Sequence, residues 1–193
     1  MARPREFDID DAIAKAVEVF WLRGYDGAAL PDLLNGMGIA RGSLYKAFGD
    51  KKQLYLRVLQ RYDEVAVAGA VELLTDPSEP DGAKRIARLF DTVIDVVREG
   101  DRKGCLMCNA AAGPASDDAD IGRVVSRMLT RMTQAFAGAA GFPAGPGMAP
   151  RSSGSRGGKP DCVLCGFAHS CQGRRTGRPA ASRCRCSRRQ KPS

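Results

Sequence analysis

The sequence predicts an all-α protein, and three observations support this. Apolar side chains recur at helical spacing over long stretches of residues 1–142, the pattern of helices with one buried face. Acidic residues precede several of these stretches and glycines follow them, as expected at helix ends. The chain also has a single Trp and only 6% aromatic residues, a composition typical of α-rich proteins.

The first three predicted helices lie in residues 1–49, which we interpret as one domain. Asp8 is the predicted N-cap of the first helix, and Gly24 is placed to end it in a left-handed conformation. Gly38 separates the second helix from the third. The expected ranges are about 10–23, 31–37 and 41–48.

A larger helical region is expected over residues 50–142. Asp50 is the predicted N-cap of its first helix, and glycines at 100 and 104 flank a break within it. The last helix starts among Asp117, Asp118 and Asp120, whose carboxylates we assign to the helix start rather than to a cation site. The expected helices cover about 50–74, 81–99, 104–112 and 117–140.

Periodicity stops after Phe142, so the third segment is a tail over residues 143–193. It holds eleven Lys or Arg against one acid, and it is rich in Gly, Pro, Ser and Cys. Such a composition buries too little apolar surface to offset the entropy of ordering, which predicts disorder. The net charge of +8 therefore belongs to the tail, because residues 1–142 carry nineteen bases against twenty-one acids.

A helix-turn-helix pattern stands out over residues 33–51. Such a motif places its second helix in the major groove, and it needs an apolar inner face, a small turn residue and a polar outer face. The predicted inner face consists of Leu33, Leu34, Ile39, Leu44 and Phe48. The predicted outer face consists of Arg41, Gly42, Ser43, Tyr45 and Lys46.

The run from Gly24-Tyr25 through Met37-Gly38-Ile39, Gly42-Ser43-Leu44-Tyr45, Phe48 and Asp50-Lys51 resembles the N-terminal domain of the TetR family. The resemblance implies a homodimeric transcriptional regulator with a DNA-binding domain of three helices and a larger helical ligand-binding domain. It also implies repression of an operator in double-stranded DNA, with release when a small-molecule effector binds.

By position in that motif, Arg41, Ser43 and Lys46 are candidates for reading bases, next to Gly42. Tyr45 and Lys51 are candidates for binding phosphate at the start of the following helix. Ala29 departs from the family, which usually places Ser or Thr there as a cap, and losing the cap costs roughly 1 kcal/mol.

Other interpretations of these residues remain open. A three-helix scaffold of this kind can bind a protein instead of DNA. Lys52, Arg57 and Arg61 are interpreted more simply as a solvated face than as DNA contacts. A regulator that fails to dimerise, or a nonspecific nucleic-acid binder, is the alternative function, and salt dependence distinguishes it from a specific dimer.

Cys105 lies in the segment Gly104-Cys105-Leu106-Met107-Cys108-Asn109, which resembles a motif in TetR regulators that sense electrophiles or oxidants. The functional interpretation is a reactive thiol whose pKa is lowered by Arg102 and Lys103. The simpler interpretation, which we favour, is a small apolar residue in a helix core. A metal site is not expected, because the Cys105 and Cys108 pair lacks two further ligands.

The effector pocket is expected among apolar residues of the larger region, although the same helical spacing fits plain core packing better. The candidate lining residues are Phe90, Met107, Met128 and Met132.

The tail carries two further hypotheses. Cys162, Cys165, His169 and Cys171 are spaced only roughly like a zinc knuckle, so zinc is disfavoured. A TetR-type chain normally ends in two long helices that form the dimer interface, whereas here Arg, Gly, Pro and Ser take over. We therefore hypothesise that the coding frame shifts near residues 142–150, which would remove that interface.

Neither an enzyme nor a membrane protein is expected. The single His lies in the tail, and neither a phosphate-loop motif nor paired carboxylates at acid/base spacing occur. No cofactor is expected. No apolar run is long enough to span a membrane and the N-terminus lacks a secretory signal, so the expected compartment is the cytoplasm.

Overall fold

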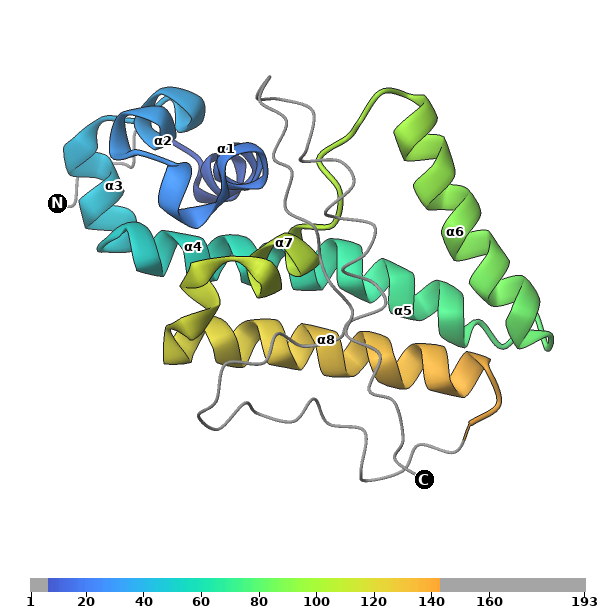
Figure 1. The fold of residues 1–193 in the computed structure, drawn as a ribbon. Helices are drawn as coiled ribbons and strands as arrows, with labels where there is room; N and C mark the ends of the chain where they lie inside the picture. The colour runs from blue at the N-terminus through green and yellow to red at the C-terminus, as the bar shows by residue number, and fades with distance from the viewer. Residues whose placement is uncertain (1–6, 143–193) are drawn as a thin grey trace, which may run out of the picture.

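The computed structural model describes residues 7–142, and the tail hypotheses on disorder, zinc and a frame shift lie outside them. The described part is helical throughout (Figure 1). Its α-helices are α1 (Ile9–Gly27), α2 (Leu30–Met37), α3 (Arg41–Phe48), α4 (Lys51–Tyr62), α5 (Ala68–Thr75), α6 (Gly82–Arg98), α7 (Leu106–Ala112) and α8 (Ala119–Ala139). The all-α prediction is confirmed for this part, and the helix boundaries agree to within a few residues.

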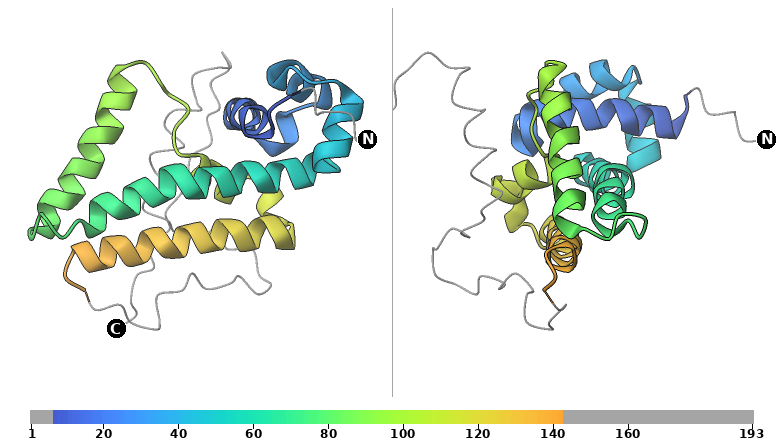
Figure 2. Two further views of the ribbon diagram at one scale, coloured as in Figure 1. Left: turned by 180° about the vertical axis from the view of Figure 1, so that it is seen from behind. Right: turned by 90° about the vertical axis from the view of Figure 1, so that its right-hand side faces the viewer.

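Helix α1 and two short helices, α2 and α3, form a head on one end of a long rod. Helices α1, α2 and α3 cluster around the start of α4, and α4 continues through a π-helical turn, Asp63–Val67, into α5 (Figures 1 and 2). Helix α8 runs alongside this rod, and α7 packs between α8, α4 and α1. The head therefore shares one continuous rod with the rest of the described chain.

The helix ends follow from side-chain caps. The carboxylates of Asp8 and Asp50 accept bonds from backbone N–H groups at the starts of α1 and α4, as predicted. Gly38 ends α2 in the left-handed conformation, as predicted, whereas Gly24 has positive φ but only kinks α1, which continues to Gly27. At α2 Ala29 offers no side-chain acceptor to the first turn, but the reverse half of a capping box is present, because the Ala29 N–H donates to the Asp32 carboxylate over 3.3 Å.

The π-helical turn between α4 and α5 is absent from the sequence prediction, which extended one helix to residue 74. Asp63 lies in this turn and is the one buried charged residue of the described chain. Its carboxylate accepts from Arg127, at 3.4 Å, and from Arg131, both on α8. The turn therefore places a carboxylate where α8 can pair with it.

Helix α6 is held only at its first turns. It leaves the end of α5 and diverges from the other helices, and α6 contains no buried residue (Figure 1). Its exposed apolar side chains are Phe90, Val93, Ile94, Val96 and Val97. Within the described part of the chain, no helix is both long and apolar enough to cross a membrane.

Candidate nucleic-acid interface

The inner face of the helix-turn-helix is buried as predicted. Leu33, Leu44 and Phe48 pack into the core that α1 and α4 complete, and Ile39 joins them from the turn. Leu34 is only half-buried, and Met37, which the sequence analysis left out of the inner face, is buried beside it. Burial of these side chains fixes α3 with its opposite face toward solvent.

Helix α2 also approaches α1 closely. A Cβ atom on Gly36 would lie 2.4 Å from a methyl group of Val19 on α1. This spacing requires a residue without a side chain at Gly36, unless Val19 rotates away. Sequence alone gives no reason for a glycine inside this helix, and packing against Val19 of α1 supplies one.

The exposed face of α3 carries the predicted DNA-contacting residues. Arg41, Gly42, Tyr45 and Lys46 are exposed and Ser43 is half-exposed. The Arg41 guanidinium lies 5.7 Å from the centre of the Tyr45 ring, one helical turn away, so cation and phenol point in a common direction. Among the described residues, neither Arg41 nor Lys46 forms an ion pair, which leaves both cations free for an anionic partner.

Lys51 extends this surface to the start of α4. Its ammonium lies 4.7 Å from the centre of the Tyr25 ring, which is held at the end of α1. Asp50 caps the same helix start by accepting from the backbone N–H of Gln53 over 2.7 Å. The Tyr25 ring thus holds the Lys51 ammonium beside the N-terminal, positive end of the α4 dipole. This arrangement is suited to binding a phosphate group.

Lys52 does not belong to a solvated face, in contrast to the simpler sequence interpretation. Its ammonium pairs with Asp118 at 2.8 Å and Asp120 at 2.7 Å, at the start of α8. These ion pairs raise the pKa of Lys52 and lower the pKa of both carboxyls. Arg57 and Arg61 are exposed, as that interpretation expected.

The head matches a family model described as bacterial regulatory proteins, tetR family, over residues 12–58. The chain is 34% identical to an uncharacterized HTH-type transcriptional regulator, YezE of Bacillus subtilis (strain 168), over 137 residues that cover 70% of each protein. It is 31% identical to the HTH-type transcriptional repressor ComR of Escherichia coli (strain K12), over 69% of this chain and 65% of that protein.

The chain belongs to the TetR family. A solved structure agrees: a cysteine mutant of the TetR family transcriptional regulator CifR, complexed with 26 bp double-strand operator DNA, is 31% identical and superposes with a TM-score of 0.56. That match covers 74% of this chain and 78% of the other. The TetR resemblance predicted from the motif is thereby confirmed, and the chain is a transcriptional regulator of this family.

A second group of residues in this TetR-family chain surrounds Cys105, the residue before α7. The Tyr62 hydroxyl donates to the Cys105 sulfur over 3.5 Å. The Tyr62 ring meets the Trp21 ring edge-on, with centres 5.3 Å apart. Cys105 is half-buried and Cys108, one turn further on, is buried. A thiol, a phenol and an indole thus connect α7, α4 and α1.

The pKa of Cys105 is lowered, which agrees with the reactive-thiol interpretation that the sequence favoured less, but not with the cause assigned to it there. A hydrogen bond from the Cys108 side chain, with further bonds from Tyr62 and from backbone N–H groups, lowers it to about 6 against the opposing effect of burial. Lys103 is occupied elsewhere, since its ammonium pairs with Glu18 at 2.7 Å and Asp101 at 3.1 Å.

The candidate effector residues divide into two sets. Met107, Met128 and Met132 are buried in the core. Phe90 is 43% exposed on α6 and lies near Phe136 of α8, with ring centres 6.5 Å apart. Phe90 thus differs from the three methionines in its exposure, and the role of all four in effector binding stays a prediction.

Proposed function

We propose that this regulator binds operator DNA through the exposed face of α3 and represses transcription until a small molecule releases it. The observation that carries the proposal is the exposed face of α3, where cations and hydroxyl groups are accessible while the inner face of the helix-turn-helix is buried. The similar regulator CifR has been solved in complex with operator DNA, which supports a DNA-binding role for this surface. We further propose a division into a head, residues 1–49, a regulatory region, residues 50–142, and a tail.

Arg41, Ser43 and Lys46 are assigned to base edges, with Gly42 leaving room for close approach. Tyr45 and Lys51 are assigned to phosphates. The two assignments predict different behaviour, because a base contact changes sequence preference whereas a phosphate contact changes affinity for all sequences.

The experiment is selection of bound sequences from genomic fragments, followed by titration of the selected operator by fluorescence anisotropy at several salt concentrations. Arg41→Ala is expected to cost about 1–3 kcal/mol and to relax sequence preference. Lys51→Ala is expected to weaken all sequences alike and to reduce the salt slope by about one.

Arg98→Ala on α6 is the matched control, because Arg98 is exposed and lies outside α3 and α4. Its affinity should equal that of the unchanged protein. Equal affinity for the selected operator and for random DNA would contradict the proposal and favour the nonspecific binder.

A homodimer is part of the proposal, as expected for the family. The bare apolar side of α6 supports it, since a soluble protein seldom leaves such a face uncovered. Light scattering on the full chain, beside a variant truncated after Phe142, measures the mass directly. A monomer in both would support the dimerisation-defective alternative.

We also propose that Cys105 is the effector-sensing group, as a thiolate that reacts with electrophiles. The specific observation is its lowered pKa together with the donor hydroxyl of Tyr62. Treatment with N-ethylmaleimide should reduce operator affinity of the unchanged protein but not of Cys105→Ser. Loss of affinity in both would assign the effect to another cysteine, and no loss in either would refute a sensing role.

Its relatives are transcriptional regulators, and we propose no enzymatic activity for this chain. Because the operator DNA that it would bind belongs to the bacterial chromosome, we place it in the cytoplasm.

A further inference from the structure

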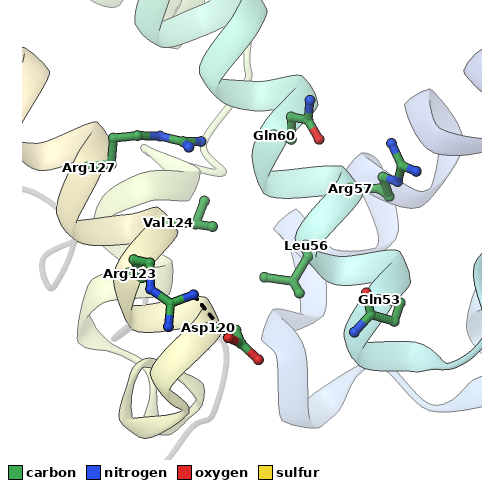
Figure 3. Close-up of a pocket in the computed structure, with 8 residues that line it drawn as sticks. All are labelled: Gln53, Leu56, Arg57, Gln60, Asp120, Arg123, Val124 and Arg127. Carbon is green, nitrogen blue, oxygen red and sulfur yellow. Dashed lines mark hydrogen bonds and ion pairs between the residues drawn. The ribbon is translucent and has the colours of Figure 1, made fainter.

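A surface groove of about 600 Å³ lies between α4 and α8, outside both groups of residues described above (Figure 3). One wall comes from α4 and the other from α8, and the two helices run side by side along it. The lining residues are Gln53, Leu56, Arg57, Gln60, Asp120, Arg123, Val124 and Arg127.

The groove is basic on both walls. Arg57 stands on α4, at the edge of that helix away from α8 in this view, whereas Arg123 and Arg127 stand on α8, and Arg127 extends toward α4 (Figure 3). Asp120 is the single acid among the lining residues. Asp120 is already shared between Lys52 at 2.7 Å and Arg123 at 3.1 Å.

Arg57 has no ion-pair partner within the described residues. Arg127 reaches only one oxygen of Asp63, at 3.4 Å, and remains 57% exposed. Each guanidinium therefore keeps N–H donors free, in the planar fork that matches a carboxylate or a phosphate.

We propose that this groove binds a small molecule with two anionic groups, carboxylates or phosphates, one held by Arg57 and the other by Arg123 and Arg127. Leu56 and Val124 face each other between the charged ends and supply an apolar floor for the part of the ligand that joins them (Figure 3). The amide of Gln53 adds a neutral donor along the α4 wall, whereas the amide nitrogen of Gln60 already donates to Glu64 over 2.9 Å.

Such a ligand would act on the angle between α4 and α8. Lys52 already joins the two helices at the end nearest the head, and α4 carries Lys51, the phosphate candidate. A dianion joining Arg57 to Arg123 would fix the same two helices further along. Its effect on operator affinity rests on the proposed function, whereas its binding does not.

The test is isothermal titration of the full chain, without DNA, with succinate, a dicarboxylate, and separately with pyrophosphate, which has two phosphoryl groups. Acetate at matched ionic strength serves as the monoanion control. Succinate or pyrophosphate should bind and acetate should bind far more weakly. Binding of succinate alone would assign a carboxylate ligand, and binding of pyrophosphate alone a phosphate ligand.

Two variants locate the site. Arg57→Gln and Arg123→Gln should each weaken dianion binding by about tenfold or more, because each removes a charged fork from one wall. Arg61→Gln is the matched control, since Arg61 is exposed on the same helix but does not line the groove. Circular dichroism checks that each variant is folded.

The inference is overturned if no dianion binds, or if Arg57→Gln and Arg123→Gln bind it as well as Arg61→Gln does. It is also overturned if Arg57→Gln loses only operator affinity, which would place a DNA phosphate at this arginine. Dianion binding without operator binding would keep this inference and refute the proposed function, so the two failures are distinguishable.

Discussion

The indole Nε1 of Trp21 donates a hydrogen bond to the carbonyl oxygen of Gly104 over 3.0 Å. Trp21 belongs to α1 of the head, and Gly104 immediately precedes the reactive-thiol candidate Cys105. Lys103 reinforces the contact, because its ammonium lies 4.7 Å from the centre of the same indole ring and pairs with Glu18 of α1. The head is thus bonded to the segment where a modification would occur.

Replacing Trp21 with Phe should weaken this connection. The change removes one hydrogen bond and part of an edge-on ring contact, so the free energy of unfolding should fall by about 1–2 kcal/mol. Urea denaturation followed by circular dichroism measures it. Leu22→Ala is the control, because Leu22 is 61% exposed beside Trp21 and should change stability little.

The same variant tests coupling between the thiol and the head. If Cys105 acts on DNA binding through Trp21, alkylation should alter operator affinity less in Trp21→Phe than in the unchanged protein. An equal response in both would show that the signal takes another route, for instance through α4.

Tyr62→Phe should raise the pKa of Cys105, because it removes a hydroxyl that donates to the thiolate. The alkylation rate with iodoacetamide should rise with pH around a midpoint of about 6 in the unchanged protein and around a higher midpoint in the variant. Midpoints near the ordinary thiol value of 9.0 in both would contradict a stabilised thiolate.

The same lowered pKa predicts how stability depends on pH. An acid whose pKa is lower in the folded state contributes stability that is complete above its unfolded pKa and is lost as pH falls toward the folded value. The Cys105 contribution to the free energy of unfolding should therefore grow between pH of about 6 and about 9. Measuring the free energy of unfolding of Cys105→Ser and of the unchanged protein across this pH range isolates the contribution of Cys105.

The helices and the α3 face could be predicted because the information is local. Asp8 and Asp50 cap helices a few residues away, and the positions of Leu44 and Phe48 determine which side of α3 is exposed. The TetR motif lies almost entirely within this local pattern, so a short segment was enough to identify it.

Contacts between distant residues could not be predicted in this way. Lys52 looked like a surface lysine because its partners Asp118 and Asp120 are distant in the sequence, and those carboxylates looked like simple helix-start residues for the same reason. The cause of the lowered Cys105 pKa was also misassigned, because the main donor is its near neighbour Cys108 rather than a cation, and the further donor Tyr62 lies on another helix. The π-helical turn was missed because five such residues hardly disturb an apolar stripe.

Asp63→Asn should destabilise the chain strongly. Asp63 is buried, and its charge balances the two α8 arginines that reach it, so the neutral amide leaves them without a counter-charge. Removing one partner of a buried pair typically costs about 3–5 kcal/mol, and we expect somewhat less here because Arg127 and Arg131 are partly exposed. Asp91→Asn, at an exposed site on α6, is the control in thermal unfolding.

Two glycine substitutions should change stability in opposite directions. A Cβ atom on Gly82, at the start of α6, would lie 1.7 Å from the backbone carbonyl oxygen of Ala139 at the end of α8. Gly82→Ala must therefore push the two helices apart, at a cost of about 1–3 kcal/mol. Gly69 in α5 has nothing within 4 Å of the same position, so Gly69→Ala should stabilise the helix by about 0.5–1 kcal/mol.

Urea denaturation of the two variants, with hydrogen exchange across α6, decides whether α6 depends on this contact. Faster exchange in α6 of Gly82→Ala alone is expected, because the first turns of α6 are where it is held against α8. Unchanged exchange together with unchanged stability would mean that α6 is anchored through some other surface. Its exposed apolar side would then be the first candidate, and the mass measurement would have to be repeated on this variant.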